Sequence, residues 1–441
     1  MHRFIVLLAV VLTAQMSSAQ AILPVRSPGI GFARKYLSST DGIPIRELIR
    51  LALAANGEIA IARLEVERAE ARLIQAGARP NPTLQVEQES GRPVGSPGEG
   101  KLTVGVEVPL EVFGQRGRRM DAAEAEIALR RAEIAAKERS VTGEVIVVYI
   151  EALVLVREIA TMDEVLTLDE ETARFVQLRV NEGETAPLEL SLLQAEVERL
   201  RARRLLFEGR LQASISKLKF FAGIPHGQPL KLAEDITTAS FRPLPQTAAE
   251  GVGLALKNRP EVRISGLQEE LAEAELKVAE SRSRPDISAT ARYAQGRSVF
   301  DDPLGAYAQR DRSLAFGVSI GLPVFDRGKG EKAEAAIAIR QARERRIFAE
   351  NVIRSEVTAA FERIAAAERS LNTFRTSVLP RSRANIETVR KVYEIGDLKV
   401  TDLIAEQRKL LETDRDLIEI HSEKYRAEAD LFLAIGLLME K

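Results

Sequence analysis

Two long stretches of the chain repeat apolar residues with the period of an α-helix. In the first, apolar side chains recur every three or four positions among Arg, Glu and Ala from Arg118 to Asn181, without a proline. A helix of these roughly 64 residues would be a rod of about 96 Å, whereas a typical helix has about 11–12 residues. A matching stripe begins after Gly328, and Pro380 predicts a bend or a break within it. The apolar positions are Ile127, Leu129, Ile134, Val141, Val145, Val148, Ile150, Leu153 and Leu155 in the first stretch, and Ile337, Ile339, Ile347, Val352, Ile353, Val357, Phe361, Ile364 and Leu371 in the second.

Shorter stretches with a period of two precede each long helix. Thr83–Glu89 and Leu102–Leu110 alternate before the first, and Ile287–Ala294 and Leu314–Leu322 alternate before the second. We therefore expect four strands of about nine residues, which is the length that crosses a bilayer when tilted. A long loop is expected over Gln295–Arg312. Because an isolated two-stranded hairpin is marginal in water, these strands must join a larger sheet.

Further helices are predicted around these elements. One covers about Pro44–Ala78 and ends before a proline. Two returning helices, about Pro187–Phe220 and Lys399–Leu433, follow the long ones. The chain is expected to turn at Gly183 and Gly396, because glycine readily adopts the left-handed conformation that ends a helix. The pattern therefore predicts two antiparallel helical hairpins.

The same order of elements occurs twice, which indicates an internal repeat. We place the first unit at residues 45–223 and the second at 246–437, joined by a proline-rich linker at 224–245. Residues 22–44 are expected to form an extended arm. The matched positions include Gly105 and Gly317, Gly183 and Gly396, Glu189 and Asp402, and Gln194 and Gln407, each pair 212 or 213 residues apart.

The first residues have the features of an export signal. A short basic start precedes the apolar run Phe4–Thr13, and small residues follow it, so residues 1–21 are expected to be a signal peptide. Ten apolar residues are too few to span a bilayer. The sequence contains no cysteine, which excludes an acylated N-terminal cysteine, disulfides and thiolate metal sites.

Charge and composition exclude several classes of function. The 63 basic and 64 acidic residues are mixed along the chain, so no basic field is available to attract nucleic acid. The three histidines, His2, His226 and His421, share no ligand spacing, which argues against a zinc or copper site. No arrangement of a nucleophile with a base, or of paired carboxylates, is apparent, so we expect neither a catalytic site nor a cofactor.

The duplicated pattern resembles the TolC family of outer-membrane efflux channels over nearly the whole chain after the export signal. The resemblance rests on the twofold order of elements, the Tyr-x-x-Gly motif at Tyr393–Gly396 and the Arg-Pro-Asn-Pro motif at Arg79–Pro82. Leu110–Arg116 and Leu322–Arg327 look like the heavy-metal branch of the family, of the cobalt–zinc–cadmium type.

This resemblance implies a mainly α-helical fold with a small β part. Each chain would contribute four strands to a 12-stranded barrel in a homotrimer, and the helical hairpins would continue the barrel as a tunnel in the periplasm. The physical argument agrees independently, because four strands are too few to close a barrel and the smallest closed barrels have about eight.

The resemblance also implies roles for the turns of the helical hairpins. By their places in the motif, Tyr393, Asp402 and Glu189 would form a periplasmic gate, and threefold symmetry would arrange the two acids in rings that favour cations. Leu398 and Ala405 stand where some members carry a basic and an acidic gate residue, so the closing salt bridges of those members are not expected here. The tips expected to dock a periplasmic adaptor protein are centred on Gly183, Glu184, Gly396 and Asp397.

We therefore expect an outer-membrane channel that catalyses no reaction and contacts outer-membrane lipid. Substrates, expected to be heavy-metal cations, would arrive from an inner-membrane RND-type pump through the adaptor. The sequence leaves two alternatives open: export of drugs or other organic compounds, and a periplasmic coiled-coil adaptor. The twofold unit argues against the adaptor, which would have a single hairpin.

Overall fold

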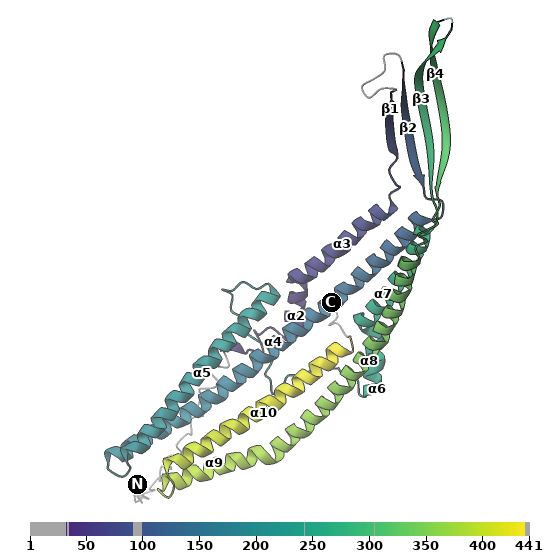
Figure 1. Cartoon of the computed structure of the whole chain (residues 1–441). Coiled ribbons are helices and arrows are strands. Elements are labelled where there is room, and N and C mark those ends of the chain that lie inside the picture. The colour runs from purple at the N-terminus through teal and green to yellow at the C-terminus, as the bar shows by residue number, and fades with distance from the viewer. Residues whose placement is uncertain (1–31, 33–34, 91–98, 242, 304, 437–441) are drawn as a thin grey trace, which may run out of the picture.

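The chain forms an elongated, curved molecule with strands at one end and helical hairpins at the other (Figure 1). This computed structural model describes residues 32, 35–90, 99–241, 243–303 and 305–436. The predicted export signal and much of the predicted arm lie outside these residues.

Both units show the predicted order of elements. The first contains α2 (Ile45–Ala55), α3 (Gly57–Gly77), β1 (Thr83–Glu89), β2 (Gly100–Leu110), α4 (Gln115–Asn181) and α5 (Pro187–Ala222). The second contains α6 (Ala248–Asn258), α7 (Pro260–Arg282), β3 (Asp286–Asp302), β4 (Gly305–Gly321), α8 (Lys329–Thr373), a π-helical segment (Phe374–Val378), α9 (Leu379–Glu394) and α10 (Val400–Ala434). Helix α4 has 67 residues, which corresponds to about 100 Å. The predicted long helix and both helical hairpins are therefore confirmed.

The structure adds two details to the helices predicted from the sequence. The single helix predicted over Pro44–Ala78 is wrong, because the chain breaks at Asn56. The Asn56 side chain accepts hydrogen bonds from the N–H groups of Glu58 at 2.8 Å and Ile59 at 3.3 Å, and thereby starts a second helix. The predicted distortion near Pro380 is confirmed. It takes the form of the π-helical segment one turn earlier, since proline cannot donate to the preceding turn.

The four strands form one antiparallel sheet in the order β1-β2-β3-β4. Strands β3 and β4 have 17 residues each and pair along their whole length, from Asp286 with Gly321 to Asp302 with Gly305. The predicted loop over Gln295–Arg312 is therefore wrong, and the strands are unequal in length rather than uniformly nine residues. In this stretch arginines lie on the face that is apolar further in, and Phe300 and Tyr307 lie on the other face. This removes the apolar alternation, whereas backbone pairing does not depend on side-chain polarity.

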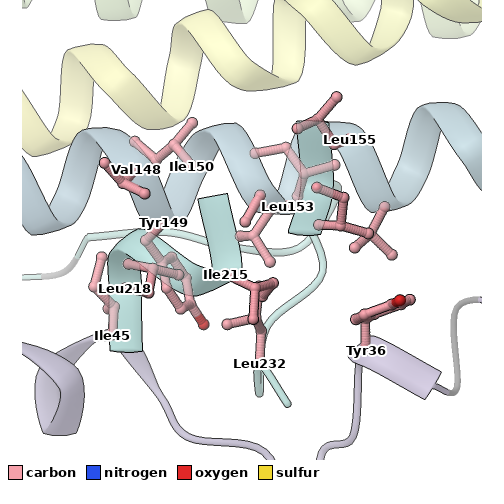
Figure 2. Close-up of a cluster of buried hydrophobic side chains, with 14 of the residues drawn as sticks. Tyr36, Ile45, Val148, Tyr149, Ile150, Leu153, Leu155, Ile215, Leu218 and Leu232 are labelled. Carbon is pink, nitrogen blue, oxygen red and sulfur yellow. The ribbon is translucent and has the colours of Figure 1, made fainter. Parts of the chain in front are cut away.

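The core lies where the hairpins meet the linker. Leu232 of the linker is fully buried among side chains of α4 and α5 (Figure 2), and its N–H donates to the carbonyl of Tyr36 at 2.8 Å. Buried Glu428 of α10 accepts hydrogen bonds from Ser240 Oγ at 2.9 Å and from the N–H of Phe241 at 3.0 Å. The linker therefore ties the two hairpins together at mid-length, leaving the sheet and the hairpin tips at opposite ends.

Candidate functional site

The register of the sheet sorts its side chains into two chemically different faces. Residues directly opposite each other on neighbouring strands point to the same face. One such row joins Leu84, Val106, Ala291 and Phe316. The apolar face comprises Leu84, Val86, Leu102, Val104, Val106, Val108, Leu110, Ile287, Ala289, Ala291, Tyr293, Leu314, Phe316, Val318 and Ile320. Phe316 is 77% exposed in the single chain, so the described residues of the protomer leave this face uncovered.

The opposite face is mainly polar or small, and near the β3–β4 turn it also carries the stacked aromatic pair Phe300 and Tyr307. Gln85 Nε2 donates to Glu107 Oε2 at 3.1 Å. Gly105 lies beneath the Arg292 side chain, where an added Cβ would be only 2.9 Å from Cγ of that arginine. The polar face comprises Thr83, Gln85, Glu87, Glu89, Lys101, Thr103, Gly105, Glu107, Asp286, Ser288, Thr290, Arg292, Ala294, Asp311, Ser313, Ala315, Gly317 and Ser319. One face of the sheet therefore suits hydrocarbon and the other suits water.

The sheet is open at both sides. Strands β1 and β4 are its outer strands, and within the described residues neither pairs with a further strand. In hydrocarbon, each unpaired backbone N–H or C=O group costs several kcal/mol of free energy. A sheet whose apolar face contacts lipid must therefore be continued by strands from outside this chain.

At the other end of the molecule, the two helical hairpins turn in the same way. Gly183 and Gly396 adopt positive φ values of 77° and 91°. Each glycine donates its N–H to the carbonyl three residues earlier, at 3.1 Å and 3.0 Å. The next residue, Glu184 or Asp397, donates to the carbonyl five residues before it, at 2.9 Å and 3.2 Å. These paired bonds form a Schellman motif, so the predicted tips are confirmed as turns.

The three predicted gate residues have different surroundings. Tyr393 is only 3% exposed and its hydroxyl has no hydrogen-bond partner within the described residues. Burial raises the pKa of Tyr393, and the charge of Glu189, which is half-buried in the first turn of α5, raises it further. Asp402 instead caps its own helix. Its Oδ2 accepts a hydrogen bond from the N–H of Lys399 at 3.2 Å, at the start of α10.

An apolar cluster joins the two hairpins just above the tips. Its buried members are Val176, Leu193, Tyr393, Val400, Leu403 and Ile404. They come from α4, α5, α9 and α10, so the tips of one protomer are packed against each other. The four expected docking residues, Gly183, Glu184, Gly396 and Asp397, remain exposed beyond this cluster.

A buried polar pair lies next to this cluster, and the sequence did not reveal it as a site. Asp169 of α4 is 2% exposed and Gln407 of α10 is 4% exposed. Asp169 Oδ1 and both amide atoms of Gln407 lack hydrogen-bond partners. Burial, followed by the charge of Glu196, raises the pKa of Asp169 to about 7. Its position on the buried stripe of α4 between Leu166 and Val176 was the available signal.

Within the described residues, no three His, Cys, Asp or Glu side chains are grouped as metal ligands. In that same part of the chain, none of the helices combines the length and apolar character needed to cross a membrane.

Comparison with known proteins identifies the family. The sequence profile described as outer membrane efflux protein matches residues 48–223 and 251–437. The chain belongs to the outer membrane efflux protein family. The two matches correspond to the two repeat units, so the resemblance to TolC-family channels is confirmed and the alternative of a periplasmic adaptor is wrong.

The names of relatives in this family refer to different substrates. The cobalt-zinc-cadmium resistance protein CzcC of Cupriavidus metallidurans is 23% identical over 89% of this chain and 90% of its own length. The pyoverdine export outer membrane protein OpmQ of Pseudomonas putida is 22% identical over 88% of this chain and 85% of its own length. The crystal structure of the outer membrane protein VceC of Vibrio cholerae matches with a TM-score of 0.70, at 19% identity, over 89% of this chain and 96% of that chain.

Membership of this family assigns the two ends of the molecule to compartments. The protein is an outer-membrane efflux channel whose β part crosses the outer membrane and whose helical hairpins extend into the periplasm. The apolar face of the sheet is thus the surface that meets lipid.

Proposed function

We propose that three copies of this chain close their sheets into one 12-stranded barrel and line one continuous export duct. The observation that carries this proposal is the sheet itself, which has one apolar face, one polar face and two unpaired outer strands. Three copies satisfy both edges and place the polar face around a water-filled lumen. The mass of the protein in mild detergent tests the assembly: three chains are expected, and a single chain would contradict it.

The hairpin tips support a partner at the periplasmic end. The exposed tip residues Glu184 and Asp397 form rigid turns rather than loose loops, which suits docking of a periplasmic adaptor connected to an inner-membrane RND-type pump. Behind them, the charge of Glu189 acts on the buried hydroxyl of Tyr393, and these two residues, with Asp402, would gate the entrance. In single-channel recordings, replacing Glu189 and Asp402 by alanine is expected to weaken block by multivalent cations. Unchanged block would count against the gate.

Heavy-metal cations are the substrate class that we propose. CzcC, a cobalt-zinc-cadmium resistance protein, matches this chain over 90% of its own length. The polar face of the sheet agrees with cation passage, because its acidic side chains outnumber its basic ones and rings of acids favour cations. The described charged residues on this face are Glu87, Glu89, Glu107, Asp286 and Asp311, against Lys101 and Arg292.

Export of organic compounds is the second candidate, because OpmQ is named for pyoverdine export. A strain lacking this protein separates the two. We expect the deletion to raise sensitivity to cobalt, zinc and cadmium by several-fold, and the full chain supplied in trans to restore resistance. A chain with Val318→Arg, which should not form a channel, is the matched negative control. Sensitivity confined to drugs or siderophore-like compounds would replace metals by organic substrates.

A further inference from the structure

Three exposed arginines lie at the outer end of the apolar face. Arg297 pairs directly with Arg310 across β3 and β4, and Arg312 pairs with Gln295. By strand alternation all three lie on the same face as Tyr293, one or two rows beyond it. We call Arg297, Arg310 and Arg312 the arginine patch. They fall in the stretch that the sequence pattern assigned to a loop.

The patch is positively charged and is not neutralised by the described part of the chain. All three arginines are exposed, and none forms an ion pair within the described residues. Like charges directly opposite each other destabilise an antiparallel pair. The neighbouring acid, Asp311, lies on the opposite face and accepts a hydrogen bond from Gln309 Nε2 at 3.0 Å. The guanidinium groups of Arg297 and Arg310 therefore repel each other, and an anionic partner would reduce this repulsion.

The position of the patch relative to the membrane follows from the rows of the sheet. From Ile287 to Arg297 the strand advances ten residue steps, or about 33 Å. A strand tilt of about 40° converts this into about 25 Å of height, the height of the apolar band of an outer-membrane barrel. Since the helices are periplasmic, the turn between β3 and β4 faces the cell exterior (Figure 1). Tyr293 is an aromatic residue near the outer end of this face, and the arginine patch begins in the next row, which Leu102 shares. The patch is thus level with the headgroups of the outer leaflet.

We propose that the arginine patch binds the phosphate groups of phosphorylated lipids in the outer leaflet of the outer membrane. The proposal rests on the lipid-facing assignment of the apolar face and on the barrel proposed above, and does not depend on the substrate. Arginine presents a planar fork of donors that fits phosphate oxygens in pairs. Arg297 and Arg310 are directly opposed, with Cβ atoms about 5 Å apart, so both forks reach one phosphate. Arg312, two residues along β4, reaches the same phosphate or that of the next lipid.

The test measures lipid preference of the purified full-length protein in neutral detergent. The probes are a fluorescent lipid A that carries two phosphates and the same lipid after phosphate removal, each followed by anisotropy. The unchanged protein is expected to bind the phosphorylated lipid at least about tenfold more tightly, because charge-assisted contacts are lost with the phosphates. Arg297→Gln with Arg310→Gln should reduce this preference to within about twofold.

The matched control removes two positive charges from the opposite face of the same sheet, with Lys101→Gln and Arg292→Gln. It is expected to keep the preference. The proposal is overturned if the unchanged protein binds both lipids equally, if the Arg297/Arg310 variant keeps the preference, or if the control loses it to the same extent. Displacement of the phosphorylated lipid by millimolar inorganic phosphate would assign the patch to free phosphate and also overturn the proposal.

The same samples report on the assembly. Light scattering measures the molecular mass of each sample, and circular dichroism confirms that the protein is folded. A trimer without a preference for lipid phosphate would contradict only the proposed role of the arginine patch. A monomer would contradict the proposed barrel and, with it, the role of the patch. If the double variant does not fold, Arg310→Gln alone serves for the same comparison, with a smaller expected loss of preference.

Discussion

Val318→Arg is expected to abolish most assembly of the channel. Val318 lies on the apolar face in one row with Val108 and Ala289, and it is 68% exposed in the single chain. An arginine near the middle of the bilayer on a lipid-facing strand costs about 2–4 kcal/mol. Three copies would carry this cost in each trimer, so the total reaches about 6–12 kcal/mol, which is comparable to the stability of a typical folded domain.

The adjacent residue provides the matched control for this prediction. Ser319 follows Val318 on β4 but points to the polar face, opposite Ser288. Ser319→Arg should leave assembly nearly unchanged, because the new side chain enters water. The fraction of trimer recovered from outer membranes is the measurement. Equal recovery of both variants would show that the apolar face does not contact lipid.

The second large effect concerns pH and the buried carboxyl of Asp169. Its pKa is raised to about 7 in the folded chain, first by burial and then by Glu196. The unfolded chain loses this proton near pH 4, so between about pH 4 and 7 the folded state binds more protons. The free energy of unfolding therefore falls as pH rises through this window, and the loss is complete above about pH 7. A shift of about three pKa units corresponds to about 4 kcal/mol at most.

Asp169→Asn removes this loss because an amide stays neutral and offers Gln407 both a donor and an acceptor. We expect the variant to unfold at a clearly higher temperature than the unchanged protein at pH 8, and at nearly the same temperature at pH 4. Helical circular dichroism during heating measures this difference. Glu164→Gln, at an exposed position of the same helix, is the control and should show no such dependence on pH. A stabilisation by Asp169→Asn that is equal at both values would contradict the raised pKa.

Local pattern was sufficient for the helical part of the fold. The apolar stripe of α4 repeats with the helical period over dozens of residues, so its extent could be predicted within a few residues of Gln115–Asn181. Gly183 and Gly396 were recognisable as turns because their backbone conformation is one that other residues avoid. The break at Asn56 could not be predicted, because asparagine also occurs inside helices. Only the structure shows that its side chain caps the start of a new helix.

The strands were predicted only where one face is apolar. Beyond Tyr293 the outer part of the β3–β4 hairpin has arginines on the face that is apolar further in and the aromatic pair Phe300 and Tyr307 on the other, so its pairing leaves no clear alternation in the sequence. The arginine patch was missed for this reason. Asp169 was missed because a single acid within a charged helix looks like any exposed acid until the neighbouring helix covers it.

By itself, the sequence determined the elements, their twofold repetition and the two tips, because each depends on residues near one another in the chain. Only the tertiary structure decided which side chains share a face of the sheet, which acid is buried between α4 and α10, and that the linker binds the hairpins together. These features depend on register and packing between segments far apart in sequence, and such contacts follow from the folded arrangement rather than from local periodicity.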